Sequence, residues 1–208
     1  MCSIFGIFDL QSAEESQQLR CEALERSGRQ RHRGPDWSGV YLDAGAILVH
    51  ERLAIVDPAG GSQPLLSEDG ALALAVNGEI YNHRILKREL QQPYVFQTES
   101  DCEVINALYR EDAPASFLNC LNGIFAFALW DKAKGRAIIA RDPIGVVPLY
   151  WGHDAQGRLR VASEMKALAD DCADVAQFPP GHWYDSATGE LTQYYQRPWR
   201  DYDAVQGV

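Results

Sequence analysis

The sequence predicts an α+β fold in which strands dominate and helices are few. Short runs rich in Val, Ile, Phe and Ala recur along the 208 residues and are separated by Gly, Pro and Asp, a pattern typical of buried strands joined by turns. Two segments instead carry the Ser-x-x-Glu spacing of a helix capping box. With 46% hydrophobic and 23% charged residues, the chain can build a sizeable core, so one large domain or at most two small ones are expected.

The strands are placed by these apolar runs, each bounded by turn-forming residues. We expect strands near Ser3–Phe8, Gly39–Leu42, Ala46–His50, Ala71–Val76, Ile124–Trp130, Arg136–Arg141, Val147–Trp151 and Arg158–Ala162.

The first helix is predicted from a capping box, in which a hydroxyl and a glutamate three residues later satisfy exposed backbone amides at the helix start. Ser12 and Glu15 form this pair, and the helix should run to about Arg26, with Gly28 as its stop signal. A further, shorter helix is expected near Arg84–Gln91.

A second capping box, formed by Ser100 and Glu103, predicts another helix. Its apolar face would consist of Val104, Ile105 and Leu108, which follow the helical spacing.

Charge argues against nucleic acid and anionic membrane surfaces as partners. The net charge is −10, so the overall field repels phosphate groups. The one counter-argument is a local basic cluster, Arg26, Arg29, Arg31, His32 and Arg33. On an acidic chain, such a cluster more often serves the fold or a small anionic ligand.

The cysteines suggest neither a metal site nor a disulfide framework. Cys21, Cys102, Cys120 and Cys172 show no CxxC spacing, and five cysteines are an odd number. No basic leader precedes the first strand, and the longest apolar stretch, Ile124–Trp130, is too short to cross a bilayer. We therefore expect a cytoplasmic protein without a metal or disulfides.

Cys2 is the strongest candidate for a catalytic residue. Removal of Met1, which a small second residue permits, would leave Cys2 with a thiol and a free α-amine. Thiols titrate near about pH 8.5 and α-amines near about 7.7 to 8.0, so the amine can accept the thiol proton. An activated nucleophile needs such an adjacent base. The alternative is that Cys2 is merely a small buried hydrophobic residue.

Asn77 and Gly78 allow two interpretations. They lie between the apolar run ending at Val76 and Glu79–Tyr81, and Asn-Gly is the favoured pair for a two-residue hairpin turn. Alternatively, the Asn77 amide and the Gly78 backbone N–H are oxyanion-hole donors.

Arg52 and Asp101 also allow two interpretations each. Arg52 lies at the end of a strand, where its guanidinium could hold a carboxylate or form a surface ion pair. Asp101 lies in the first turn of a predicted helix, where its charge could bind a ligand or only complement the helix dipole. The loop 31–36 is either a mobile lid or a connection.

Other chemistries lack their motifs. No GxSxG sequence of a serine hydrolase occurs, nor a Walker A or GxGxxG nucleotide-binding pattern.

Taken in order, these elements resemble the glutaminase domain of class II glutamine amidotransferases, most closely that of the bacterial glutamine-hydrolysing asparagine synthetases of the B type. The resemblance covers nearly the whole chain. It rests on CSIFG from Cys2, RHRGPDWSG from Arg31, HERLAIVD from His50, NGEIYNH from Asn77, TESDCEV from Thr98, GIFAFALWD from Gly123, RDPIGVVPLY from Arg141, ASEMKAL from Ala162 and FPPG from Phe178.

The resemblance implies an N-terminal-nucleophile hydrolase fold, a four-layer αββα sandwich with two mostly antiparallel sheets. It implies that Cys2 attacks the side-chain amide of L-glutamine and that Asn77 and Gly78 stabilise the oxyanion. The remaining substrate contacts would be Arg52 to the α-carboxylate, Glu79 and Asp101 to the α-ammonium, and the backbone of Leu53, Ala54, Ile55 and Val56 along the pocket.

The chain departs from this family at its end. Residues 1–195 correspond to the glutaminase domain, and residues 196–208 read as the start of a linker, without the pyrophosphate loop that such synthetases carry in a second domain. ATP and Mg²⁺ are therefore expected only for that missing domain, and no cofactor is expected here. The expected partner is a synthetase domain or subunit that accepts ammonia, and homodimerisation stays open. The alternatives are a glutaminase that serves another acceptor and a non-catalytic interaction domain of the same fold.

Overall fold

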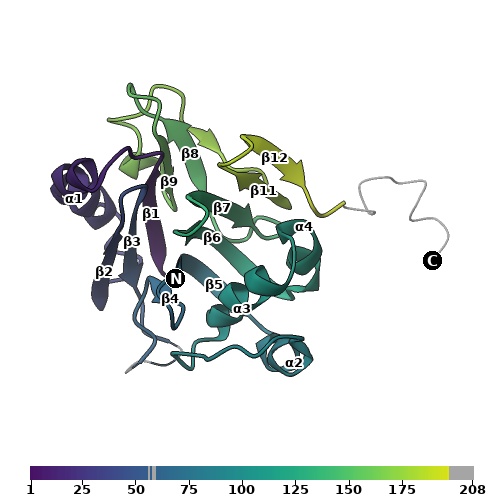
Figure 1. Cartoon of the computed structure of the whole chain (residues 1–208). Coiled ribbons are helices and arrows are strands. Elements are labelled where there is room, and N and C mark those ends of the chain that lie inside the picture. Colours follow the sequence, from purple (N-terminus) through teal and green to yellow (C-terminus); the bar gives the residue numbers. More distant parts are fainter. Residues whose placement is uncertain (56, 58–59, 197–208) are drawn as a thin grey trace.

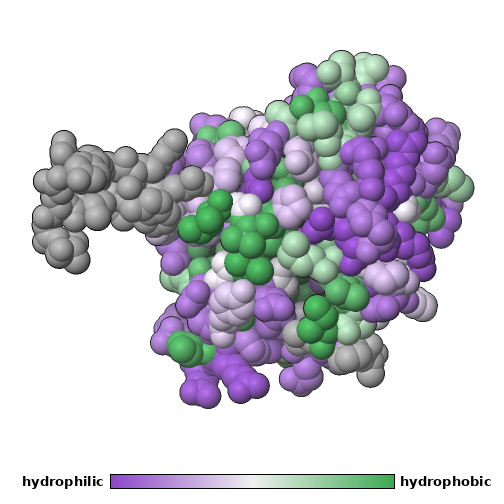
Figure 2. Space-filling model, turned by 180° about the vertical axis from the view of Figure 1, so that it is seen from behind, coloured by the Kyte–Doolittle hydropathy of each residue, from purple (hydrophilic) through white to green (hydrophobic). Residues whose placement is uncertain are grey.

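Two antiparallel sheets lie face to face between two layers of helices (Figure 1), which confirms the predicted four-layer αββα sandwich. This computed structural model describes residues 1–55, 57 and 60–196. Within these residues, each sheet has six strands. From behind, hydrophilic side chains cover much of the surface, with smaller hydrophobic groups between them (Figure 2).

The first sheet has the order β10-β8-β9-β1-β3-β2. Its strand β1 lies in the interior and pairs with β3 through Ser3 and Glu51 and with β9 through Phe5 and Ala162. The strands are β1 (Ser3–Phe8), β2 (Trp37–Leu42), β3 (Ala46–Arg52), β8 (Tyr150–His153), β9 (Leu159–Ala162) and β10 (Ala176–Gln177).

The second sheet has the order β12-β11-β7-β6-β5-β4. Its longest pairing joins β5 to β6, from Leu72 opposite Asp131 to Ile80 opposite Gly123. The strands are β4 (Leu65–Leu66), β5 (Leu72–Ile80), β6 (Gly123–Asp131), β7 (Arg136–Arg141), β11 (His182–Asp185) and β12 (Glu190–Gln193).

Helices cover the outer face of each sheet (Figure 1). Helix α1 packs on the first sheet, whereas α2, α3 and α4 lie on the second. Among the described residues, no helix has the length and apolar character needed to span a membrane. The helices are α1 (Ala13–Gly28), α2 (His83–Glu89), α3 (Val104–Glu111) and α4 (Pro114–Phe117), with 3₁₀-helices η1 (Asp101–Glu103), η2 (Leu118–Cys120) and η3 (Met165–Ala167).

The second sheet separates large and small side chains onto its two faces. Side chains alternate along a strand, so Leu72, Leu74 and Val76 of β5 face the helices, while Ala73 and Ala75 face the first sheet. Strand β6 repeats this arrangement up to Leu129, with Ala126 and Ala128 toward the first sheet, but Trp130 at its end also faces inward. Small residues on the inner face allow the two sheets to pack closely.

In the first sheet, β1 is buried on both faces. Ile4 and Phe8 pack between the sheets, whereas Phe5 and Ile7 pack against the side of the sheet that α1 covers. The continuous apolar run at the start of the sequence therefore reflects a strand enclosed by two layers.

Most strands occur where the apolar runs predicted them, and β1 and β7 have the predicted bounds. The expected start of β8 at Val147 is wrong, because Val147 N–H donates to the Asp142 carboxylate in a turn and the strand begins at Tyr150. Four strands were not predicted, because they are short and lack a continuous apolar run: β4, β10, β11 and β12.

The first capping box is confirmed at the start of α1. Ser12 Oγ accepts the Glu15 N–H at 3.1 Å, while the Glu15 carboxylate accepts the Gln11 N–H at 2.7 Å. Gly28 is the last residue of α1 rather than its stop signal, because Arg29 caps the helix.

The second capping box does not form as predicted. Ser100 Oγ accepts the Cys102 N–H at 3.3 Å in η1, and the α-helix begins only at Val104. The buried Glu103 carboxylate instead accepts the backbone N–H groups of Gln97 and Thr98 at 2.7 and 2.8 Å. Glu103 therefore holds the loop that leads into the helix.

Close packing of the two sheets predicts that Ala128→Leu destabilises the protein. Ala128 is fully buried between the sheets, and overpacking a core costs about 1 to 3 kcal/mol. Urea unfolding should show this loss of free energy, while Ala155→Leu at an exposed turn should change it little. Equal stability of both variants would contradict the packing described here.

Candidate active site

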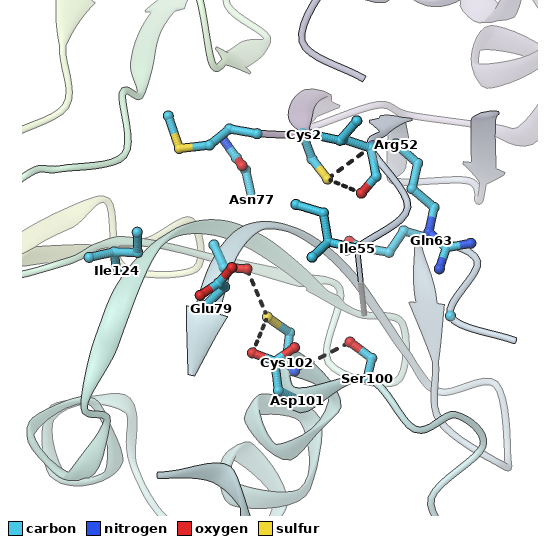
Figure 3. A pocket seen from close by; sticks show the side chains of 14 residues that line it. Cys2, Arg52, Ile55, Gln63, Asn77, Glu79, Ser100, Asp101, Cys102 and Ile124 are labelled. Atoms are coloured by element: carbon cyan, nitrogen blue, oxygen red, sulfur yellow. Dashed lines mark hydrogen bonds between the residues drawn. The ribbon is translucent and has the colours of Figure 1, made fainter. Parts of the chain in front are cut away.

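A cavity is lined by residues from the start of β1, the end of β3, β5 and η1, and Figure 3 shows their side chains. Eight of the residues predicted for the site line it: Cys2, Arg52, Leu53, Ile55, Asn77, Gly78, Glu79 and Asp101. Residues from distant parts of the chain therefore meet at one site.

The Cys2 side chain lies against the backbone of Leu53. Its sulfur accepts the Leu53 N–H at 3.3 Å and lies 3.5 Å from the Leu53 carbonyl oxygen, to which the thiol can donate. The Cys2 carbonyl accepts a hydrogen bond from Arg33 Nε at 3.1 Å, so the loop 31–36 contacts the backbone of the candidate nucleophile.

The strand that follows Cys2 is held tightly in place. The Ile4 N–H donates to Ser163 Oγ at 3.0 Å, and the Ile4 carbonyl accepts the Ser163 N–H at 3.1 Å. The Gln30 side chain donates to the same carbonyl at 3.3 Å. These bonds fix the start of β1, and with it the direction of the Cys2 side chain.

Arg52, the last residue of β3, is 6% exposed and lines the cavity. Its Nη2 donates to the Asp57 carbonyl, and the Asp57 carboxylate accepts the N–H groups of Gly60 and Glu99 at 2.9 and 3.0 Å. Because Arg52 is buried, the alternative that placed it in an ion pair at the surface is wrong about its position.

Asn77 and Gly78 lie within one unbroken strand. β5 runs from Leu72 to Ile80, and Asn77 and Gly78 pair with Ala126 and Phe125. The predicted hairpin turn is therefore wrong. Asn77 is 1% exposed, and its Nδ2 has no hydrogen-bond partner among the described residues. A buried donor without a partner costs free energy. The Asn77 amide is therefore a candidate to donate a hydrogen bond to a bound ligand.

Gly78 is required by the backbone. Its φ is +156°, and a Cβ atom there would collide with the Ile124 carbonyl oxygen and lie 2.6 Å from Phe125 Cα. The position therefore accepts only glycine without strain.

The cavity carries both signs of charge, since the Arg52 guanidinium and the Glu79 and Asp101 carboxylates line it. Asp101 Oδ2 accepts the Ile80 N–H at 2.6 Å, which ties η1 to β5. Burial, followed by the nearby charge of Asp101, raises the pKa of the Cys102 thiol well above its ordinary value. Cys102 therefore stays protonated, and Cys2 remains the candidate nucleophile of the cavity.

Two predicted backbone contacts are not part of this cavity as described. Ala54 does not line it, and its N–H donates to the Asp36 carboxylate at 2.8 Å. Val56 lies outside the described residues.

Sequence reasoning missed several lining residues: Gly61, Gln63, Ser100, Cys102 and Ile124. Ser100 and Cys102 occur within the quoted TESDCEV motif, whereas nothing in the sequence marks Gln63. In the described part of the chain, no cluster of His, Cys, Asp and Glu has metal-binding geometry.

The strained backbone at Gly78 predicts that Gly78→Ala destabilises the protein. Forcing alanine into this conformation should cost on the order of 2 kcal/mol, and the clash with Ile124 adds to it. Gly70→Ala is the matched control, because Gly70 also has a positive φ, +67°, but has open space around it. Urea unfolding should therefore show a larger loss for Gly78→Ala, and an equal or smaller loss would refute the steric argument.

Comparisons with known proteins agree with this architecture. A solved glutamine phosphoribosylpyrophosphate amidotransferase from B. subtilis has a TM-score of 0.74 and 23% identity, covering 94% of this chain and 50% of that one. At this identity, the likeness establishes the fold alone.

Curated relatives are more similar in sequence. Asparagine synthetase B [glutamine-hydrolyzing] from Escherichia coli (strain K12) is 54% identical over 206 residues, which are 99% of this chain and 37% of the relative. A probable asparagine synthetase [glutamine-hydrolyzing] from Dictyostelium discoideum is 50% identical over 210 residues, 100% of this chain and 37% of the relative. The chain thus spans little more than a third of these relatives.

The family profile described as "Glutamine amidotransferase domain" matches residues 1–180. This match includes every lining residue of the cavity. The chain therefore belongs to the glutamine amidotransferase domain family.

Proposed function

We propose that this chain hydrolyses the side-chain amide of L-glutamine to glutamate and ammonia, as the ammonia-supplying half of a glutamine-hydrolysing asparagine synthetase. The observation that carries this proposal is the position of Cys2 in a cavity with a buried, unpartnered Asn77 amide and with charges complementary to a free amino acid. The names of the curated relatives support the synthetase assignment.

The charged groups account for recognition of the amino-acid end of glutamine. The Arg52 guanidinium can hold a carboxylate by two parallel hydrogen bonds, and Glu79 and Asp101 can hold the α-ammonium. Leu53 and Ile55, which line the cavity, would border the same substrate. The side-chain amide of glutamine would then extend toward Cys2.

The nucleophile requires loss of Met1. Before its removal, Met1 itself lines the cavity, and the α-nitrogen of Cys2 is part of a peptide bond. Removal of Met1 frees the α-amine and vacates part of the cavity. The α-amine can then take the thiol proton, directly or through a water molecule.

The reaction proceeds by attack of the Cys2 sulfur on the amide carbon. The carbonyl oxygen becomes an oxyanion, which Asn77 Nδ2 and the Gly78 N–H stabilise. Ammonia leaves with the proton that the α-amine had accepted, and a γ-glutamyl thioester remains. Water then hydrolyses the thioester to glutamate and restores the thiol.

The curated relatives are much longer than this chain, and their additional length suggests the remaining partners. A synthetase domain or subunit would accept the ammonia, and ATP and Mg²⁺ would act there, with no cofactor in this chain. A homodimer is a further proposal. Five free cysteines fit a reducing compartment, and we propose the cytoplasm.

Cys2→Ala should abolish glutamine hydrolysis, because Cys102, the other thiol among the described cavity residues, stays protonated. The measurement is ammonia release from glutamine, together with covalent labelling by a glutamine-analogue diazoketone. Cys120→Ala, which removes an exposed thiol, should leave both signals intact. Ammonia release by Cys2→Ala at the wild-type rate would overturn the assignment of the nucleophile.

Asn77→Ala should lower turnover by roughly a hundredfold or more, because losing one oxyanion donor costs about 2.7 to 4 kcal/mol. The loss should appear in kcat, since the donor acts mainly in the transition state. Asn119→Ala, at an exposed position, is the matched control. Normal turnover by Asn77→Ala would exclude the oxyanion role.

A further inference from the structure

The direction of the Asn77 amide is determined by its backbone. The side chain is buried, and its Nδ2 has no hydrogen-bond partner within the described part of the chain. No bond from another described side chain therefore directs this nitrogen into the cavity. The groups that hold β5 at this point decide where the donor lies.

Gln63 binds both backbone groups of the preceding residue, Val76. The Val76 N–H donates to Gln63 Oε1 at 2.8 Å, and Gln63 Nε2 donates to the Val76 carbonyl at 3.0 Å. Strand β4 pairs Leu65 with Leu74, so an antiparallel register places residue 63 opposite Val76. The Gln63 carboxamide thus extends the hydrogen-bond pattern between β4 and β5 with side-chain atoms.

His50 holds the same carbonyl from the other sheet. His50 lies in β3 and is fully buried, and its Nε2 is 3.0 Å from the Val76 carbonyl oxygen. Burial lowers the pKa of His50 to about 4, and the charge of Arg52 also lowers it, which outweighs the opposing effect of the hydrogen bond. The ring is therefore neutral at neutral pH. Because a carbonyl only accepts, the ring proton lies on Nε2.

This bond connects the two halves of the proposed site. In the first sheet, His50 pairs with Ile4 on β1, two residues after Cys2. In the second sheet, Val76 directly precedes Asn77. The hydrogen bond between His50 and Val76 therefore links the two sheets near the site. In the first sheet, Cys2 directly precedes β1 and Arg52 ends β3, whereas in the second sheet β5 carries the proposed oxyanion donor.

We propose that His50 is a positioning residue, which sets the Asn77 amide relative to Cys2 by holding the Val76 carbonyl. Gln63 also donates a hydrogen bond to this carbonyl, from the edge of the second sheet. The inference rests on the proposed function, because it concerns the geometry of that reaction. Among the described residues His50 is not part of the cavity lining, whereas Gln63 is. A His50 variant therefore tests positioning without removing a substrate contact.

The test compares His50→Met, which removes the N–H donor, with His50→Gln, whose amide nitrogen can occupy nearly the place of Nε2. His50→Met should lower kcat on glutamine by about tenfold to a hundredfold, as expected for a small misplacement of a catalytic group. KM should stay within about threefold, since ground-state binding is retained. His50→Gln should restore most of kcat, and His153→Met, at an exposed position, should match the wild type.

A double-mutant cycle separates positioning from a general loss of structure. If His50 acts through Asn77, then adding His50→Met to Asn77→Ala should lower kcat by less than about threefold further. The proposal would be overturned if His50→Met lowered kcat as strongly in the Asn77→Ala background as in the wild type. A change in KM as large as the change in kcat would also overturn it. Urea unfolding of each variant confirms that the assays compare folded proteins.

A second readout does not depend on activity. Selective ¹⁵N labelling of asparagine gives a side-chain amide signal for Asn77, identified by its absence in Asn77→Ala. This signal should shift or broaden in His50→Met and return to its position in His50→Gln. An unchanged signal in His50→Met would refute positioning. If the wild-type chain releases no ammonia, the proposed function fails, and this spectrum alone decides the role of His50.

Discussion

The antiparallel pairing of β1 with β3 places Cys2 and Arg52 at the same end of the first sheet, because Ser3 pairs with Glu51. A shift of this register by one residue would turn Cys2 to the other face of the sheet. Ser163 holds β1 in this position, because its Oγ accepts the Ile4 N–H at 3.0 Å and its own N–H donates to the Ile4 carbonyl at 3.1 Å. These contacts help determine where Cys2 lies relative to the guanidinium, and the other parts of the site depend on this placement.

The second sheet supplies the groups that complement this pair. Its small inner residues allow β5 to lie close to the first sheet, and Asn77 follows these alanines along the same strand. Gly78 allows a backbone conformation that other residues cannot adopt without strain. The same close packing lets His50 reach the Val76 carbonyl across the two sheets. The packing between the two sheets therefore contributes both to the stability of the fold and to the geometry of the site.

Much of the architecture could be predicted from the sequence, since apolar runs mark strands and Ser12 with Glu15 marks a helix start. The site residues could be predicted only through the resemblance of their motifs. Asn77 and Gly78 show why local reasoning failed, because their preference for turns is overridden by pairing with β6. The partners of Glu103 and His50 also depend on contacts between segments far apart in the chain. No local pattern specifies such contacts.

The central claim is that the thiol and the α-amine of Cys2 act together on the glutamine amide. The most direct test measures ammonia release by the chain without Met1, prepared with a free or an acetylated α-amine on Cys2. Acetylation should abolish release, because an amide nitrogen cannot accept the thiol proton. Equal rates for the two forms would contradict it.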